Sequence, residues 1–168
     1  MKSHTPDLSR RSFLKLSAAS GATLLLASCS SAGAEKLTFI DRLIGHPLTQ
    51  LPQIEDAWLL ENGRLLLNLS KLPEFKTLGG AVRIEGDALA DPLLVVLGED
   101  SNYYAFINAC THAGRMIDPV KGTMTLECCS VSSSTYNYAG EVLSGPAAET
   151  LTSYAVSVEN DYLSVLLN

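Results

Sequence analysis

From residue 57 onward, short apolar runs alternate with turn residues, a pattern typical of β-strands joined by tight turns. The first two runs, 58–60 and 65–67, flank Asn62 and Gly63, which favour a two-residue hairpin turn because both tolerate positive φ. No long segment in this part repeats its apolar residues at helical spacing. The pattern therefore predicts an all-β sandwich or barrel. Further strands are predicted at 81–85, 93–97, 103–108, 124–127, 136–138, 154–158 and 163–167.

The part of the chain before this β-pattern is organised differently. Residues 30–36 are small and polar, which indicates a flexible tether. Residues 37–54 contain Pro47 and Pro52, so we predict an extended and irregular course for them. The predicted organisation is an export segment at 1–28, a tether with an extended N-terminal segment at 29–56, and one β-domain at 57–168.

The N-terminus has the features of a targeting signal. Arg10 and Arg11 precede an uncharged run, 16–28, that is too short for a comfortable transmembrane helix. This arrangement resembles the twin-arginine export signal S-R-R-x-F-L-K. The run leads into L-A-S-C, which ends at Cys29 and resembles a bacterial lipobox, in which the cysteine is lipidated and begins the mature protein. The resemblance implies export by the twin-arginine route and a membrane anchor through lipid at Cys29, on the periplasmic or cell-surface side; an uncleaved anchor is the alternative.

Composition narrows the class of protein. The chain has 168 residues, which fits one domain, and its 46% hydrophobic residues argue against disorder. It has 12 basic and 18 acidic residues, and removing 1–28 leaves a net charge of -9 because four basic residues and one acidic residue are lost. Phosphate contacts need Lys and Arg, so nucleic acid is not a predicted partner.

Candidate chemistry gathers around two short segments. Cys110 and His112 follow a predicted strand, and Cys129 follows another. A thiol and an imidazole two residues apart, with a second thiol on another loop, are a combination that binds metal ions. Zinc would need a fourth ligand, and no further Cys or His side chain lies nearby in the sequence; His46 is predicted to be an ordinary surface residue.

The residues around these ligands resemble those of the Rieske iron–sulfur domain family. The run from Cys110 to Gly114 matches the first cluster box, C-x-H-x-G. The second box, C-P-x-H-G-S-x-F/Y followed by G-P-A, is matched by its end, at 134–136 and 145–147. The resemblance extends from residue 57 to the C-terminus. It implies antiparallel sheets with a small subdomain of two cluster-binding loops, and a [2Fe-2S] cluster.

Rieske centres use two cysteines on one iron and two histidines on the other. Counting back from Tyr136 places Cys129 on the second ligand cysteine and Ser132 on the second histidine. The resemblance therefore implies an incomplete ligand set, with serine in place of one imidazole. The residues that it assigns to the site are Cys110, His112, Cys129 and Ser132, surrounded by Ser134, Tyr136 and Pro146.

Cys128 adds a third thiol to this region. Adjacent residues of a strand point to opposite faces, so Cys128 and Cys129 are not expected to bind one iron. Cys128 is therefore interpreted as a buried apolar residue. If the cluster is absent, Cys110 and Cys129 would lie close together and could form a disulfide.

Two functions follow from the resemblance. The first is electron transfer by an exported iron–sulfur protein, with a periplasmic redox enzyme or cytochrome as partner. The second is a cluster-free binding or accessory subunit that keeps the Rieske fold. An oxygenase would need a second domain with a mononuclear iron, for which the chain lacks length. No nucleophile, acid–base pair or phosphate loop is visible, so an electron-transfer or accessory protein is favoured over a stand-alone enzyme.

Overall fold

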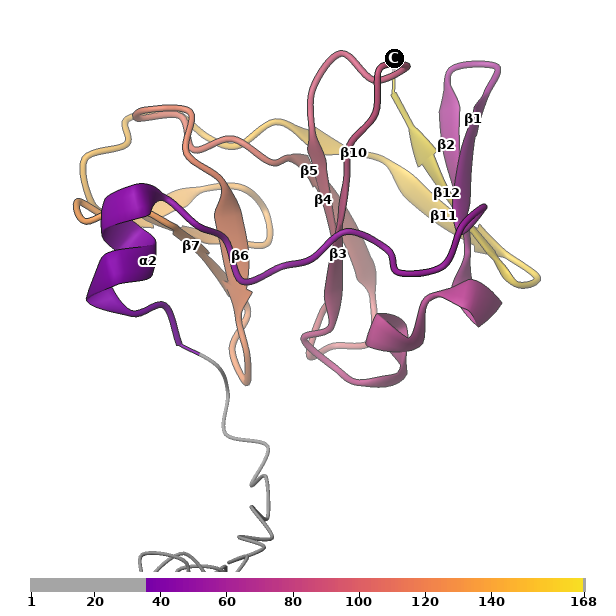
Figure 1. Ribbon diagram of the computed structural model, residues 1–168, viewed down its shortest axis with the longest axis horizontal. Coiled ribbons are helices and arrows are strands. Elements are labelled where there is room, and N and C mark those ends of the chain that lie inside the picture. The colour runs from indigo at the N-terminus through magenta and orange to yellow at the C-terminus, as the bar shows by residue number, and fades with distance from the viewer. Residues whose placement is uncertain (1–35, 168) are drawn as a thin grey trace, which may run out of the picture. The chain divides into compact units, whose positions relative to one another are not determined.

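The computed structural model of the chain describes residues 36–167, which form three four-stranded antiparallel sheets with little helix (Figure 1). The prediction of an all-β fold is confirmed. The strand orders are β1-β2-β12-β11, β10-β5-β4-β3 and β6-β7-β8-β9. The strands are β1 (Trp58–Glu61), β2 (Arg64–Asn68), β3 (Ala81–Ile84), β4 (Leu93–Leu97), β5 (Tyr103–Ile107), β6 (Ile117–Val120), β7 (Thr125–Cys128), β8 (Thr135–Asn137), β9 (Val142–Ser144), β10 (Ser153–Tyr154), β11 (Val156–Glu159) and β12 (Tyr162–Leu166). The helical elements are α2 (Phe39–Ile44) and the 3-10 turns η1 (Leu69–Lys71) and η2 (Pro73–Lys76).

The sheet of β3, β4, β5 and β10 is buried on both faces and lies between the other two (Figure 1). Every residue of β4 is buried. Leu93, Val95 and Leu97 belong to a first core shared with β2 and β12, whereas Leu94 and Val96 belong to a second core shared with β6, β7 and β8. Because side chains alternate along a strand, one apolar strand serves both cores.

The hairpin predicted around Asn62 and Gly63 is confirmed. β1 and β2 pair in the register Glu61 with Arg64, and the two turn residues have φ of 50° and 73°. Positive φ at both central positions matches the right-handed twist of the strands. Local turn chemistry therefore sets this register.

Two strands, β6 and β9, lie where the sequence predicted none, and the single strand predicted at 154–158 is divided into β10 and β11, which belong to different sheets. Pro119 interrupts the apolar pattern of β6, and proline is tolerated there because β6 is an edge strand. The neighbouring Asp118 is buried, and its carboxylate accepts hydrogen bonds from the backbone N–H groups of Leu48 and Thr49, at 3.0 and 2.8 Å. These bonds hold the N-terminal segment against the third sheet.

The prediction of an extended course at 37–54 is wrong for α2. Thr38 and Asp41 form a capping box at the start of the helix, and Gly45 ends it with φ of 75°. Pro47 lies beyond that end, so it does not interrupt the helix. Among the described residues, no helix is long and apolar enough to cross a membrane.

Candidate functional site

The loop between β5 and β6 buries one site residue and exposes the other. The backbone N–H of Cys110 donates to Arg115 O at 2.7 Å, and that of Gly114 donates to Cys110 O at 2.8 Å. Gly114 has a φ of 67°, which closes the turn. As a result Cys110 is only 2% exposed, whereas His112 lies on the exposed turn.

Tyr136 of β8 joins this loop to the third sheet. Its ring is fully buried, and its hydroxyl lies 3.1 Å from the Sγ atom of Cys110. The same hydroxyl accepts from Thr111 N at 3.3 Å and contacts Thr111 Oγ1 at 3.2 Å. The resemblance assigned Tyr136 to the surroundings of the site, and the structure brings it onto the Cys110 thiol.

The thiol that lies with Cys110 is that of Cys128, not Cys129. Cys128 is 1% exposed and, like Cys110, belongs to the second core. Each of the two thiols affects the pKa of the other. Cys129 is also buried, but its thiol donates to Gly45 O at 3.4 Å, at the end of α2. Cys128 and Cys129 therefore point to different sides, as alternation along a strand predicts, and Cys128 is the one that shares the second core with Cys110.

The register of β7 explains this placement. Leu126 pairs with Tyr136, and Cys128, two residues on, pairs with Ile117. Residues two apart share a face of the sheet, so Cys128 points to the side of Tyr136. The interpretation of Cys128 as a buried apolar residue is confirmed. Its place beside Cys110 was not predicted, because the count through the loop assigned that place to Cys129, whereas the period of two along the strand was the available signal.

The pKa values of the two thiols shift in opposite directions. Burial alone would raise the pKa of Cys110, but hydrogen bonds from Tyr136, Cys128 and the backbone of His112 and Ala113 stabilise its thiolate and bring the pKa below the ordinary value. Burial raises the pKa of Cys128 to about 11, and the neighbouring Cys110 adds to the increase. Cys110 is therefore the more acidic thiol of the two.

The turn at 145–147 packs against Ser134, which lies in the second box. Its hydroxyl is fully buried and accepts from the backbone N–H of Ala147 at 3.0 Å. Gly145, with φ of 94°, lies so near the backbone of Ser133 that a Cβ atom on Gly145 would come within 2.4 Å of Ser133 O. Pro146 is exposed, next to this close approach. The Gly-Pro-Ala turn therefore packs directly on the second box, with Ser134 as its hydrogen-bonding link.

Comparison with known proteins identifies the family. The family model of the Rieske [2Fe-2S] domain matches residues 71–155, half of the chain. The chain belongs to the Rieske [2Fe-2S] domain family. The family model of the twin-arginine translocation signal sequence matches residues 7–27, so the chain is an exported Rieske-type protein of the electron-transfer class. That signal and Cys29 lie outside the described residues, and lipidation of Cys29 stays a prediction.

Two solved structures are similar to parts of this chain. The plasma membrane Rieske protein PetC3 from Synechocystis PCC 6803 is 26% identical over 51% of this chain and 85% of that chain, with a TM-score of 0.44. The ferredoxin of carbazole 1,9a-dioxygenase from Nocardioides aromaticivorans IC177 is 21% identical over 61% of this chain and 95% of that chain, with a TM-score of 0.49. No curated protein matches the chain in sequence.

A Rieske domain implies a [2Fe-2S] cluster, but the described residues do not fit a complete one. His112 and Ser132 are both exposed, and no second imidazole accompanies His112. Cys129 faces Gly45 rather than Cys110. Across 36–167, no three His, Cys, Asp or Glu side chains are grouped so that they could hold a metal ion. Cys110 and Cys128 share the second core, whereas His112 lies on the exposed turn.

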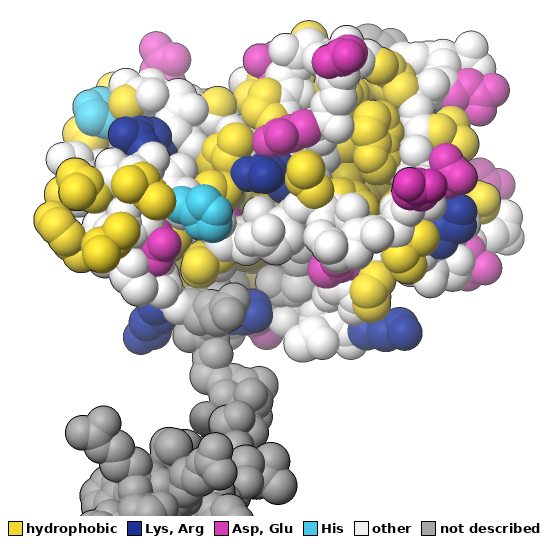
Figure 2. Space-filling model, viewed as in Figure 1, with side chains coloured by type: hydrophobic (Ala, Val, Ile, Leu, Met, Phe, Trp, Pro, Cys, Tyr) yellow, Lys and Arg dark blue, Asp and Glu magenta, His cyan; other side chains and the backbone are white. Residues whose placement is uncertain are grey.

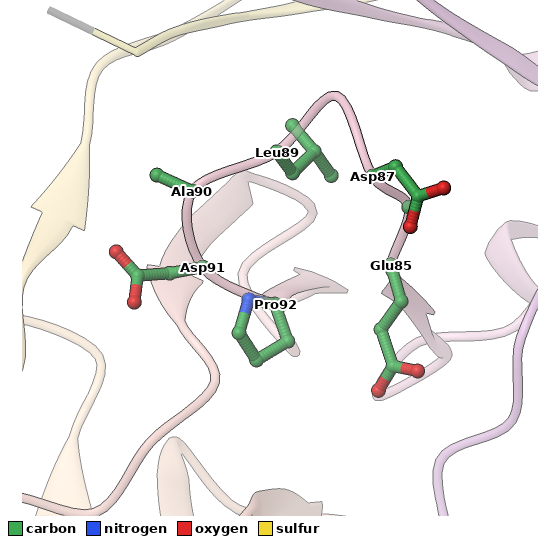
Figure 3. A pocket seen from close by; sticks show the side chains of 7 residues that line it. Glu85, Asp87, Leu89, Ala90, Asp91 and Pro92 are labelled. Carbon is green, nitrogen blue, oxygen red and sulfur yellow. The ribbon is translucent and has the colours of Figure 1, made fainter.

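A hollow elsewhere on the Rieske domain offers no alternative centre. It is formed by the loop between β3 and β4, and it is lined by Glu85, Asp87 and Asp91, together with apolar neighbours. Figure 3 shows that these three carboxylates point away from one another. Carboxylates that diverge in this way cannot share one cation.

Proposed function

We propose that this Rieske protein is anchored by lipid at Cys29 on the export side of a membrane and serves an electron-transfer system as an accessory subunit with an incomplete cluster site. The match to the export signal and the match to the Rieske domain support this role. The anchor rests on the L-A-S-C sequence that ends at Cys29.

The observation that carries the proposal is the missing second imidazole. The chain has three histidines, of which His4 lies in the export segment. His46 is exposed and follows Gly45, the residue that ends α2. Only His112 remains near the cluster boxes, so one iron of a Rieske cluster would have a single protein nitrogen. A serine hydroxyl such as that of Ser132 is a poor replacement, because it binds iron only when deprotonated.

A second candidate function is that of an electron carrier in its own right. The contact between the Tyr136 hydroxyl and Cys110 Sγ, at 3.1 Å, favours it. Hydrogen bonds to the sulfur atoms are among the features that set the reduction potential of an iron–sulfur centre.

The charge of the exported chain indicates the type of partner. After removal of residues 1–28 the net charge is -9, and opposite charge on a partner speeds encounter. A periplasmic redox enzyme or cytochrome with a basic surface fits this requirement.

Iron and sulfide analysis of anaerobically purified protein, with electron paramagnetic resonance of the reduced form, tests the two functions. We expect substoichiometric iron. The variant Ser132→His should retain more iron because it restores a nitrogen ligand, whereas Val131→His, an exposed neighbour on the same loop, should not. Two irons per chain with a Rieske-type spectrum in the unmodified protein would refute the accessory role and establish the carrier.

Mass spectrometry of the membrane fraction tests export and anchoring. The expected mature chain begins at an acylated Cys29. A soluble chain that still begins at Met1 would contradict both.

A further inference from the structure

We propose that Cys110 and Cys128 form a redox-active thiol pair that closes to a disulfide within the second core. The inference rests on the proposed incomplete cluster site, because a bound cluster would occupy the thiols. It differs from the Cys110–Cys129 disulfide predicted from the sequence in the partner that Cys110 takes.

The geometry of the second core supports this pairing. Cys110 and Cys128 are both at most 2% exposed and lie in the same cluster of buried side chains. The Tyr136 hydroxyl lies 3.1 Å from Cys110 Sγ and holds that thiol in place. Ser130 Oγ lies 3.3 Å from Cys128 Sγ. Cys128 lies on the same face of β7 as Leu126, which pairs with Tyr136, so it faces the side of the sheet on which Tyr136 contacts Cys110.

Cys129 is excluded as the partner by the direction of its side chain. Its thiol donates to Gly45 O, and the groups that act on it are Asp118 and Arg115. These groups lie on the opposite side of β7 from Tyr136. A disulfide from Cys110 to Cys129 would require the end of β7 to rotate.

The oxidation proceeds by thiol–disulfide exchange with an exported protein disulfide. Cys110 lies at the base of the exposed turn 111–114, so its thiolate attacks first and forms a mixed disulfide. The Cys128 thiolate then attacks Cys110 Sγ and releases the oxidant. One S–S bond forms and one breaks, two electrons pass to the oxidant, and the two protons lost from the cysteines end on its two thiols.

The test uses the full-length chain purified in detergent without iron and treated with diamide, which takes up two electrons and two protons per disulfide. Remaining thiols are blocked with N-ethylmaleimide and mapped by mass spectrometry. We expect a cross-link between the Cys110 peptide and the 128–129 peptide. Cys128→Ser should abolish it, and the matched control Cys129→Ser should leave it unchanged.

A cross-link that survives Cys128→Ser and disappears in Cys129→Ser would overturn the pairing. So would the lack of any cross-link when urea is raised to just below the unfolding transition, where buried thiols become accessible. Iron analysis of the same samples separates this result from the accessory role. If the unmodified protein holds two irons, the accessory role fails. The pairing is then tested by the iron content of two variants: loss of iron in Cys128→Ser supports the pairing of Cys110 with Cys128, and loss of iron in Cys129→Ser contradicts it.

A different observation concerns α2, which turns its apolar side to solvent. Figure 2 shows one of the clusters of hydrophobic side chains on this face of the molecule where Figure 1 shows α2. The exposed fractions of Phe39, Ile40, Leu43 and Ile44 are 68%, 66%, 58% and 63%. A surface helix of a water-soluble domain normally has the opposite orientation, with its apolar stripe against the core.

Polar contacts hold α2 in this orientation. Arg42 Nη2 lies 2.9 Å from Glu127 Oε1, and Nη1 donates to Ser130 O at 3.4 Å. Arg42 lies on the side of the helix opposite to Ile40 and Ile44, so its ion pair with β7 directs these apolar side chains outward.

We infer that this face of α2 rests on the lipid bilayer. Phe39 comes ten residues after Cys29 in the sequence, and ten extended residues span at most about 35 Å. A lipid on Cys29 therefore keeps the helix within reach of the membrane surface. Helices with one apolar face lie in the interface between lipid and water. Like the thiol pair, this inference rests on the proposed function, through the anchor at Cys29.

Photoactivatable lipid probes in the membrane fraction test this contact. We expect the 37–45 segment to be labelled, and the exposed apolar pair Leu59 and Leu60 of β1 to serve as the unlabelled control. Ile44→Ser should reduce labelling, and Leu60→Ser should not change it. Equal labelling of β1, or no labelling of the 37–45 segment, would overturn the inference. The acyl mass at Cys29, read from the same digest, shows whether anchoring itself has failed.

Discussion

The two cores on either side of the middle sheet are built from different residues. The first core is aliphatic and comes mainly from regular strands, with Leu65, Val95 and Leu163 as typical members. The second core contains two thiols and two phenols, and part of it is supplied by loops: Cys110 follows β5, and Leu151 precedes β10. The middle sheet thus packs against an aliphatic core on one face and against the core that contains the two thiols on the other.

This difference teaches where polar atoms are tolerated in the protein. In the first core there is little to hydrogen-bond, whereas in the second core the Tyr136 hydroxyl, Ser134 and Cys110 satisfy one another or the backbone. Most buried polar atoms are paired, so the second core specifies its partners more narrowly. The Tyr138 hydroxyl, which has no hydrogen-bond partner among the described residues, is an exception in this core. Each prediction below tests whether a change in one core affects the stability or the thiol chemistry of the other.

The largest effect is expected from Leu65→Ala in the first core. Leu65 is fully buried, and its truncation should lower the free energy of unfolding by about 3 kcal/mol. Urea unfolding measures the loss. The rate of disulfide formation between Cys110 and Cys128 should stay unchanged, and a change in that rate would show that the two cores are coupled.

Oxidation of the thiol pair should stabilise the protein by a similar amount. A disulfide that closes a loop of this size contributes about 3 kcal/mol in the chain-entropy model. Urea unfolding before and after diamide treatment measures the gain. Cys128→Ser under the same oxidant should show no gain, and a gain in that variant would assign the bridge to another cysteine.

Ser134→Ala should destabilise the protein by about 2 kcal/mol, because the backbone N–H of Ala147 would lose its acceptor in a buried place. Ser144→Ala, at an exposed hydroxyl paired with Thr135, is the control and should have little effect. Thermal unfolding of both variants measures the difference. Equal losses of stability in the two variants would mean that the burial of Ser134 does not strengthen the contribution of its hydrogen bond.

Tyr136→Phe should cost about 1 kcal/mol, because it removes the hydroxyl that bonds Cys110 and Thr111. It should also raise the pKa of Cys110, since that hydroxyl stabilises the thiolate. Ultraviolet absorbance of the thiolate against pH measures the shift.

Tyr138→Phe is the matched control, because the Tyr138 hydroxyl is buried without a hydrogen-bond partner among the described residues. Its removal should not destabilise the protein or move the pKa of Cys110. An equal loss from both phenols would show that the hydroxyl of Tyr136 has no specific role.

The sequence by itself determined the β-architecture and the approximate positions of the cluster-box loops. The hairpin at Asn62 and Gly63 and the apolar run of β4 were predictable because turn chemistry and alternation are local properties. The export segment was recognisable for the same reason, since charge and apolar length are read along the chain. The absence of a second histidine after His112 also needed no structure.

Only the tertiary structure decided which cysteine meets Cys110 and which way α2 faces. Pairing of Leu126 with Tyr136 sets the face of Cys128, and that register depends on strands distant in sequence. The ion pair between Arg42 and Glu127 likewise joins segments 85 residues apart and turns the apolar side of α2 outward. Both outcomes follow from contacts between segments that no local pattern encodes, because the direction of a side chain is set by what packs against its element.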